Sequence, residues 1–135
     1  MIGEFLLAIE KYGNAMNSLK EVGLPKDSIL LLNRSAAYLG IKKYVSALSD
    51  ANQAATLDPT NWKAHWRKGV ALMAMSQRLF RTKMAVTAFQ DCLKCKTLPA
   101  NKVKEVEAEL GKALARLEKQ EEDAPAPDLS KCAPS

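Results

Sequence analysis

Apolar and small side chains recur every three to four residues along most of the chain, which is the period of an amphipathic α-helix. Glycine, proline and capping residues interrupt this pattern at intervals and mark where one helix stops and the next begins. The sequence therefore predicts an all-α protein with six helices, at residues 6–22, 28–39, 43–56, 62–74, 82–96 and 101–121.

A period of thirty-four residues relates two of the predicted helix pairs and places Asn33 and Arg67 at equivalent points. Gly69 follows Ser35 by the same period, at a position where two helix backbones must approach closely. Asp58 and Pro59 end one unit, because a residue before proline is pushed out of the helical region. We expect a helix-turn-helix solenoid of about two and a half repeats plus a C-terminal capping helix, with a half repeat at 1–22, full repeats at 28–61 and 62–97, and the cap at 100–121.

The ends of the repeats depart from a regular array. Ala85, Phe89 and Cys92 resume the small-large-small pattern about one helical turn late, which predicts a short insertion near residues 76–84. Upstream, the chain matches only the second half of a unit, so it begins in the middle of a repeat. Residues 122–135 lose the helical period and accumulate proline, which predicts a disordered tail.

Three polar side chains on the first helices of successive repeats are candidate ligand contacts. Asn33 and Arg67 are parallel neighbours on adjacent helices, and Lys63 lies one turn before Arg67 on the same stripe. An amide, an ammonium and a guanidinium in one groove suit a carboxylate-bearing peptide end, since charge-assisted hydrogen bonds are the strong ones. The alternative is that the cations only decorate a solvated helix surface.

Three further residues on these helices are candidates for contact with an extended peptide. Ala36 and Val70 stand about one turn after Asn33 and Arg67, and their short side chains leave room for a ligand beside Trp66. Ordinary helix packing is the interpretation that we favour for Ala36 and Val70.

Residues 31–72 resemble the tetratricopeptide-repeat (TPR) domains of cytosolic co-chaperones of the Hsp-organising-protein kind. In that family, a carboxylate clamp of five residues holds the terminal Glu-Glu-Val-Asp of heat-shock chaperones, and three of its positions fall on Asn33, Lys63 and Arg67. The other two, a lysine and an asparagine, belong to the first helix of the first repeat, which this chain lacks. The resemblance implies a co-chaperone adaptor with a partial clamp.

Composition and charge indicate which classes of partner and which cellular compartment to expect. The chain has 20 basic and 15 acidic residues and a net charge of +5, but the charges are interspersed and no basic run exceeds a pair. We therefore expect an acidic partner but no nucleic acid. The apolar run at 5–9 is too short for a signal peptide or a membrane span. Three cysteines, an odd number, indicate free thiols in a reducing compartment, so we expect a cytoplasmic protein without a membrane partner.

Catalytic and metal chemistry find little support in the sequence. Cys92 and Cys95 have Cys-x-x-Cys spacing, but no second pair exists and the single histidine, His65, lies in another helix. His65 also has no visible nucleophile or carboxylate partner, so we expect no enzyme, no metal and no cofactor.

Two alternatives stay open. One is a TPR scaffold that binds an unrelated partner or self-associates through an uncovered N-terminal helix; the other is the targeting fragment of a phosphatase, isomerase or ubiquitin ligase.

Overall fold

The computed structural model describes residues 1–124, and these residues form helices and turns with no strand. In chain order the helices are α1 (Ile2–Glu21), α2 (Ser28–Gly40), α3 (Tyr44–Leu57), α4 (Trp62–Ala74), α5 (Leu79–Lys94), the short 3-10 helix η1 (Ala100–Lys102) and α6 (Val103–Asp123). The all-α prediction is confirmed. The predicted tail lies outside the described residues, except that α6 runs two residues past the expected end at 121.

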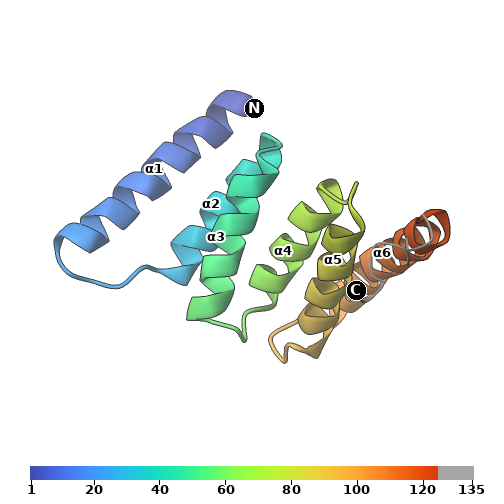
Figure 1. Cartoon of the computed structure of the whole chain (residues 1–135). Helices are drawn as coiled ribbons and strands as arrows, with labels where there is room; N and C mark the ends of the chain where they lie inside the picture. Colours follow the sequence, from blue (N-terminus) through green and yellow to red (C-terminus); the bar gives the residue numbers. More distant parts are fainter. Residues whose placement is uncertain (125–135) are drawn as a thin grey trace, which may run out of the picture.

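The helices stack side by side in an open array (Figure 1). Each helix packs against the next one in the chain, and α2 also contacts α4, two positions along. The connections α1–α2, α3–α4 and α5–α6 lie along one edge, which we call the lower edge from its place in Figure 1. The start of the chain and the turns α2–α3 and α4–α5 lie along the opposite, upper edge. Because α2 and α4 are neighbours, equivalent residues of successive repeats can share one surface.

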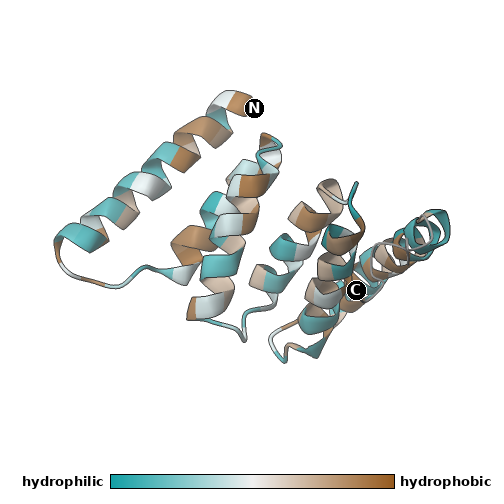
Figure 2. Ribbon diagram, in the orientation of Figure 1, coloured by the Kyte–Doolittle hydropathy of each residue, from teal (hydrophilic) through white to brown (hydrophobic). Residues whose placement is uncertain are grey.

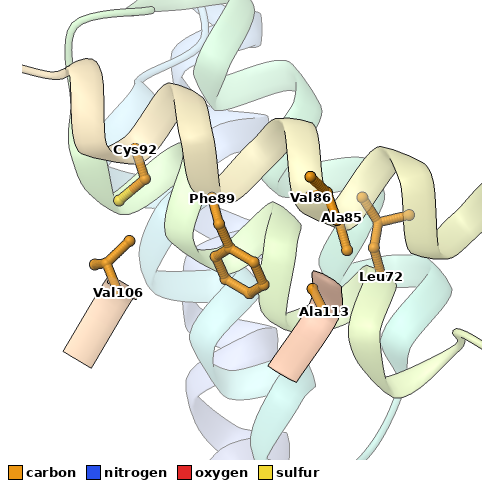
Figure 3. Close-up of a cluster of buried hydrophobic side chains, with 7 residues drawn as sticks. All are labelled: Leu72, Ala85, Val86, Phe89, Cys92, Val106 and Ala113. Carbon is orange, nitrogen blue, oxygen red and sulfur yellow. The ribbon is translucent and has the colours of Figure 1, made fainter. Parts of the chain in front are cut away.

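Two clusters of buried side chains each join three successive helices. Leu31 and Leu32 of α2 pack with Ala54 and Ala64, and a second cluster centres on Phe89 and joins α4, α5 and α6 (Figure 3). Figure 2 shows apolar (brown) and polar (teal) positions interspersed along the helices, as in amphipathic helices. The helices from α2 to α6 each bury side chains against their neighbours, as a solenoid requires, whereas α1 has no buried residue.

The close approach expected at Ser35 and Gly69 is achieved in two ways. Ser35 is fully buried and its hydroxyl donates a hydrogen bond to the carbonyl of Ala47, 2.8 Å away. Gly69 has no side chain, and a Cβ there would lie 2.5 Å from the ring of Phe89. Small residues are needed at both positions because the second helix of the repeat packs directly against them, through Ala47 in one repeat and Phe89 in the next.

The predicted insertion adds mostly helix. Ala47 is three residues into α3, whereas the equivalent Ala85 is six residues into α5. The turn before α5 spans residues 75–78, one residue longer than the turn at 41–43 before α3. Three of the four extra residues thus extend the start of α5, and our expected start at residue 82 was wrong by three residues.

The N-terminal helix is longer than expected, running from Ile2 to Glu21 instead of 6–22. Gly40 is the last residue of α2, but its backbone does not have a positive φ. The positive φ, 62°, falls on Lys42, whereas a Cβ at Gly40 would lie 2.6 Å from the ring of Phe5. Gly40 is therefore small because α1 packs across it.

Candidate functional site

A groove of about 340 Å³ lies between α2 and α4 at the lower edge, and it brings together all three polar residues predicted for peptide binding. Asn33 comes from α2, and Lys63 and Arg67 come from α4. The complete lining is Ile29, Leu32, Asn33, Asp58, Asn61, Trp62, Lys63, Arg67 and Thr97. The groove is consequently apolar at the start of α2 and cationic along α4.

The repeat explains why these residues meet. Ile29 and Asn33 are four residues apart on α2, and Lys63 and Arg67 stand at the same two positions one period later on α4. Side chains four residues apart share one face of a helix. Since α2 contacts α4, the two pairs line opposite sides of one groove.

Hydrogen bonds at the N-terminal starts of α2 and α4 fix the lower rim of the groove. Asp27 and Asn61 cap α2 and α4 by accepting hydrogen bonds from the backbone N–H of Ile29 and Lys63, at 2.8 and 3.1 Å. The Thr97 hydroxyl accepts a bond from the Trp62 backbone N–H at 3.1 Å. These hydrogen bonds thus fix the backbone at Ile29 and Lys63 without the help of a ligand.

Arg67 is the most constrained cation of the groove. Its Nη1 atom is buried and finds no hydrogen-bond partner among the described residues. Burial lowers the pKa of Arg67 from its ordinary value, although a guanidinium in a protein keeps its charge at neutral pH. A buried charged donor without a partner is costly. An anion that reached this nitrogen would accept its hydrogen bond.

Asp58 brings one negative charge to the groove. Its carboxylate accepts bonds from the Thr60 backbone N–H and hydroxyl, at 3.2 and 2.6 Å, and so holds the turn before α4. Lys63 and Arg67 form no ion pair with any residue from 1 to 124. The two cations are therefore not neutralised by Asp58.

Ala36, Trp66 and Val70 are not in the lining of this groove. Trp66 and Val70 pack against the buried cluster that joins α4, α5 and α6. The ring of Trp66 lies 5.7 Å from that of Phe89, centroid to centroid, at an interplanar angle of 55°. All three are half-buried, so a contact with an extended peptide beyond the groove stays a prediction.

Other hollows and clusters of the described residues are less suited to an anionic peptide. In a hollow of about 600 Å³ beside α1, Arg34 is already bound to Asp50 by two hydrogen bonds of 2.7 Å. Another, of about 580 Å³, contains His65 and Cys95. His65 Nε2 is hydrogen-bonded to the Pro59 carbonyl at 2.8 Å, and residues 1–124 contain no group of three metal-binding side chains. A bilayer-spanning helix is also not found in this part of the chain.

Sequence reasoning identified the polar centre of the groove but missed its apolar rim. Ile29 precedes Lys63 by one period, the same spacing that singled out Asn33 and Arg67, so the repeat contained the signal. Thr97 could not be found in this way. It reaches the groove from the α5–α6 connection, where its hydroxyl also donates to the Thr60 carbonyl at 2.6 Å.

Comparison with known proteins places the chain among repeat proteins, although no protein-family profile matches it. It is 42% identical over 87 residues to tetratricopeptide repeat protein 28 from Homo sapiens, covering 64% of the chain and 3% of that protein. It is 34% identical over 74 residues to small glutamine-rich tetratricopeptide repeat-containing protein 2 from Saccharomyces cerevisiae, covering 55% of the chain and 20% of that protein. The chain thus spans only a small part of the length of these relatives.

Two solved structures share the fold over most of their length. The first TPR of Spaghetti (RPAP3) bound to the HSP90 peptide SRMEEVD superposes with a TM-score of 0.71 at 27% identity, covering 86% of this chain and 82% of that one. The Sgt2 TPR domain from Aspergillus fumigatus gives a TM-score of 0.73 at 26% identity, covering 93% and 78%. The repeat, the stacked helix pairs and these likenesses together show that the chain is a tetratricopeptide-repeat domain, matching the carboxylate-clamp type of co-chaperones.

Proposed function

We propose that the chain is a non-enzymatic adaptor that binds the acidic C-terminal peptide of a cytoplasmic heat-shock chaperone in the groove of Asn33, Lys63 and Arg67. The observation that carries the proposal is the buried, unpartnered Nη1 of Arg67 beside an exposed Lys63 and Asn33. The peptide's terminal carboxylate would accept from the Asn33 amide and the two cations. The structural neighbour RPAP3, which holds an HSP90 peptide ending in Glu-Val-Asp, supports this choice of ligand.

The groove also offers an apolar contact next to the carboxylate site. Ile29 lies at the rim and is 62% exposed, so a ligand side chain that covered it would gain free energy from the apolar area removed from water. A peptide with a short apolar residue just before its terminal acid fits this arrangement. Binding would then combine charge-assisted hydrogen bonds with one hydrophobic contact.

Calorimetric titration tests the proposal with a peptide that ends in Glu-Glu-Val-Asp, as the free acid and as the C-terminal amide. We expect the free acid to bind more tightly by about tenfold, since hydrogen bonds to charged groups contribute roughly 1.5–3 kcal/mol each. Lys63→Ala and Arg67→Ala should each weaken the free acid. Lys68→Ala is the matched control, because Lys68 neighbours Arg67 on α4 and does not line the groove. Equal affinity for acid and amide would contradict a carboxylate site.

A second candidate function, self-association through α1, has one structural observation in its favour. No residue of α1 is fully buried, and Ile2, Leu6 and Leu7 are between 50% and 65% exposed. The rest of its outer side carries Glu10 and Asn14, so the apolar surface is confined to the first two turns. Light scattering over a concentration series would distinguish a dimer from a monomer, and a constant monomeric mass would count against this function.

The role of the whole protein is a further proposal, because the relatives extend far beyond the matched segment. The chain could serve as the targeting domain of a larger protein, including an enzyme. A parent sequence that continues into a phosphatase or ubiquitin-ligase domain would favour that role.

A further inference from the structure

Positive charge is concentrated in the two full repeats. Residues 59–90 contain no aspartate or glutamate but six lysines and arginines, namely Lys63, Arg67, Lys68, Arg78, Arg81 and Lys83. Only two of them line the peptide groove. Arg78 and Arg81 stand at the start of α5, on the upper edge. The proposed peptide site therefore leaves much of this charge unexplained.

The turn before α3 repeats this arrangement. Lys42 and Lys43 precede α3 on the same upper edge as Arg78 and Arg81 (Figure 1). A shallow hollow of about 400 Å³ joins the two turns, because Lys42 and Lys43 line it together with Met75. None of the four cations forms an ion pair with a residue in the range 1–124.

Large apolar side chains are exposed among these cations. Val45, in the first turn of α3, is 70% exposed, and Phe80, in the first turn of α5, is 52% exposed. The guanidinium carbon of Arg81 lies 5.7 Å from the centroid of the Phe80 ring. We call the set Lys42, Lys43, Val45, Arg78, Phe80 and Arg81 the basic edge.

The helix starts add to the positive field. α2 and α4, which begin at the lower edge, have side-chain caps, whereas α3 and α5, which begin at the upper edge, have none. The N-terminus of a helix bears a partial positive charge, and two such ends lie on the basic edge. The acidic side chains at the same edge are Glu4 and those at the end of α6, Glu121, Glu122 and Asp123. None of these is paired with the four cations in the described structure.

We propose that the basic edge docks on an anionic membrane surface, with Val45 and Phe80 entering the headgroup region and the four cations contacting lipid phosphates. Interfacial segments combine exposed apolar side chains with lysine and arginine in this way. Burial of Val45 and Phe80 would contribute little to binding of free phosphate or of a nucleic acid backbone. The proposal differs from our sequence-based expectation of no membrane partner, which considered only spanning segments and leaders.

Docking at this edge would leave the peptide groove open. The groove lies at the start of α2 and α4, and the basic edge lies beyond their far ends. A helix of 13 residues such as α4 separates the two by roughly 20 Å. The chain could then hold an acidic peptide and a membrane at the same time.

Vesicle co-sedimentation of the full chain tests the proposal, with phosphatidylcholine vesicles compared with phosphatidylcholine–phosphatidylserine vesicles. We expect binding only to the mixed vesicles and a decrease as salt is raised. Lys42→Ala with Lys43→Ala, or Arg78→Ala with Arg81→Ala, should lower the partition coefficient by about 25-fold, since each cation near such a surface contributes about 1 kcal/mol. The control pair, Lys96→Ala with Lys104→Ala, removes the same charge from exposed positions near the α5–α6 connection and should have a much smaller effect.

The contribution of the exposed apolar side chains to binding distinguishes a membrane from other polyanions as the partner of the basic edge. Phe80→Ser replaces an exposed side chain, so it should leave the circular dichroism spectrum unchanged and lower vesicle binding several-fold. Inorganic phosphate should compete poorly with vesicles. Equal binding to neutral vesicles, an equal loss in the control pair, no effect of Phe80→Ser, or binding to duplex DNA as tight as to mixed vesicles would each overturn the proposal.

Discussion

Gly69 of α4 lies directly against the ring of Phe89 of α5, so that a Cβ at residue 69 would be 2.5 Å from the ring. Phe89 is fully buried and is the largest side chain in the cluster shown in Figure 3. Gly69→Ala must displace this ring. We expect the free energy of unfolding to fall by about 1–3 kcal/mol, the usual cost of overpacking a core, as measured by urea denaturation.

Gly111 provides the matched control for that substitution. It lies within α6, is exposed, and a Cβ there would have no neighbour within 4 Å. Gly111→Ala should raise the free energy of unfolding by about 0.5–1 kcal/mol, because alanine loses less backbone entropy in a helix. A similar change in the two variants would show that the Phe89 contact has no special importance.

Cys92 should make stability depend on pH in alkaline solution. Burial, with a smaller contribution from Cys95, raises the pKa of the Cys92 thiol to about 12. Below about pH 9 the thiol is protonated in both the folded and unfolded chains, so it causes no pH dependence there. Above pH 9 only the unfolded chain ionises, and the free energy of unfolding should fall by about 1 kcal/mol per pH unit up to pH 12.

Denaturation of the wild type and of Cys92→Ala between pH 8 and 11 measures this effect as a difference, since other groups titrate equally in both. We expect Cys92→Ala to be less stable at pH 8 but to have a shallower decline. Parallel declines would show that Cys92 ionises as easily in the folded chain as in the unfolded one.

The ion pair between Arg34 and Asp50 holds α2 against α3. Asp50 is buried and accepts two hydrogen bonds of 2.7 Å from the Arg34 guanidinium. We expect Asp50→Ala to cost about 3 kcal/mol, the lower end for a broken buried pair, because the Arg34 side chain is 23% exposed and can reach water. The pair of Glu109 and Lys112 is more exposed to water, and breaking it by Glu109→Ala should cost less than 1 kcal/mol. Thermal denaturation of both variants compares the two.

A polar network joins the capping helix α6 to the turn before α5. Arg116 Nη1 donates to the Ser76 hydroxyl, Gln120 Nε2 donates to the Ser76 carbonyl at 2.7 Å, and the Thr82 hydroxyl donates to Gln120 Oε1 at 2.6 Å. Gln120→Ala should leave the buried Thr82 without this acceptor. We expect faster amide hydrogen exchange in the last turns of α6, with exchange in α2 unchanged. Unchanged exchange throughout would show that apolar packing alone holds α6.

The predictable parts of the fold had local signals. Pro59 ends a helix by its own geometry, Asn61 caps the next, and the thirty-four-residue period places Asn33 beside Arg67. No local sequence signal predicts the contact of Phe5 with Gly40 or the hydrogen bond between Thr82 and Gln120, because each joins residues far apart in sequence. The start of α5 was misplaced because the insertion shifted the register without any capping residue to mark it.

The burial of Arg67 was likewise beyond the sequence. Its position on the stripe could be read from the repeat, but the burial of its Nη1 atom without a hydrogen-bond partner is seen only in the folded structure. This buried nitrogen is the observation on which the proposed function rests, so the proposed interaction between Arg67 and the peptide's terminal carboxylate is the one to test.

A double-mutant cycle tests that claim most directly, combining Arg67→Gln with amidation of the peptide's C-terminus and measuring all four affinities by calorimetry. If the guanidinium binds the terminal carboxylate, amidation should weaken the wild-type complex far more than the Arg67→Gln complex, with a coupling energy of about 1.5 kcal/mol. A coupling energy of zero, with the two changes acting independently, would contradict the account.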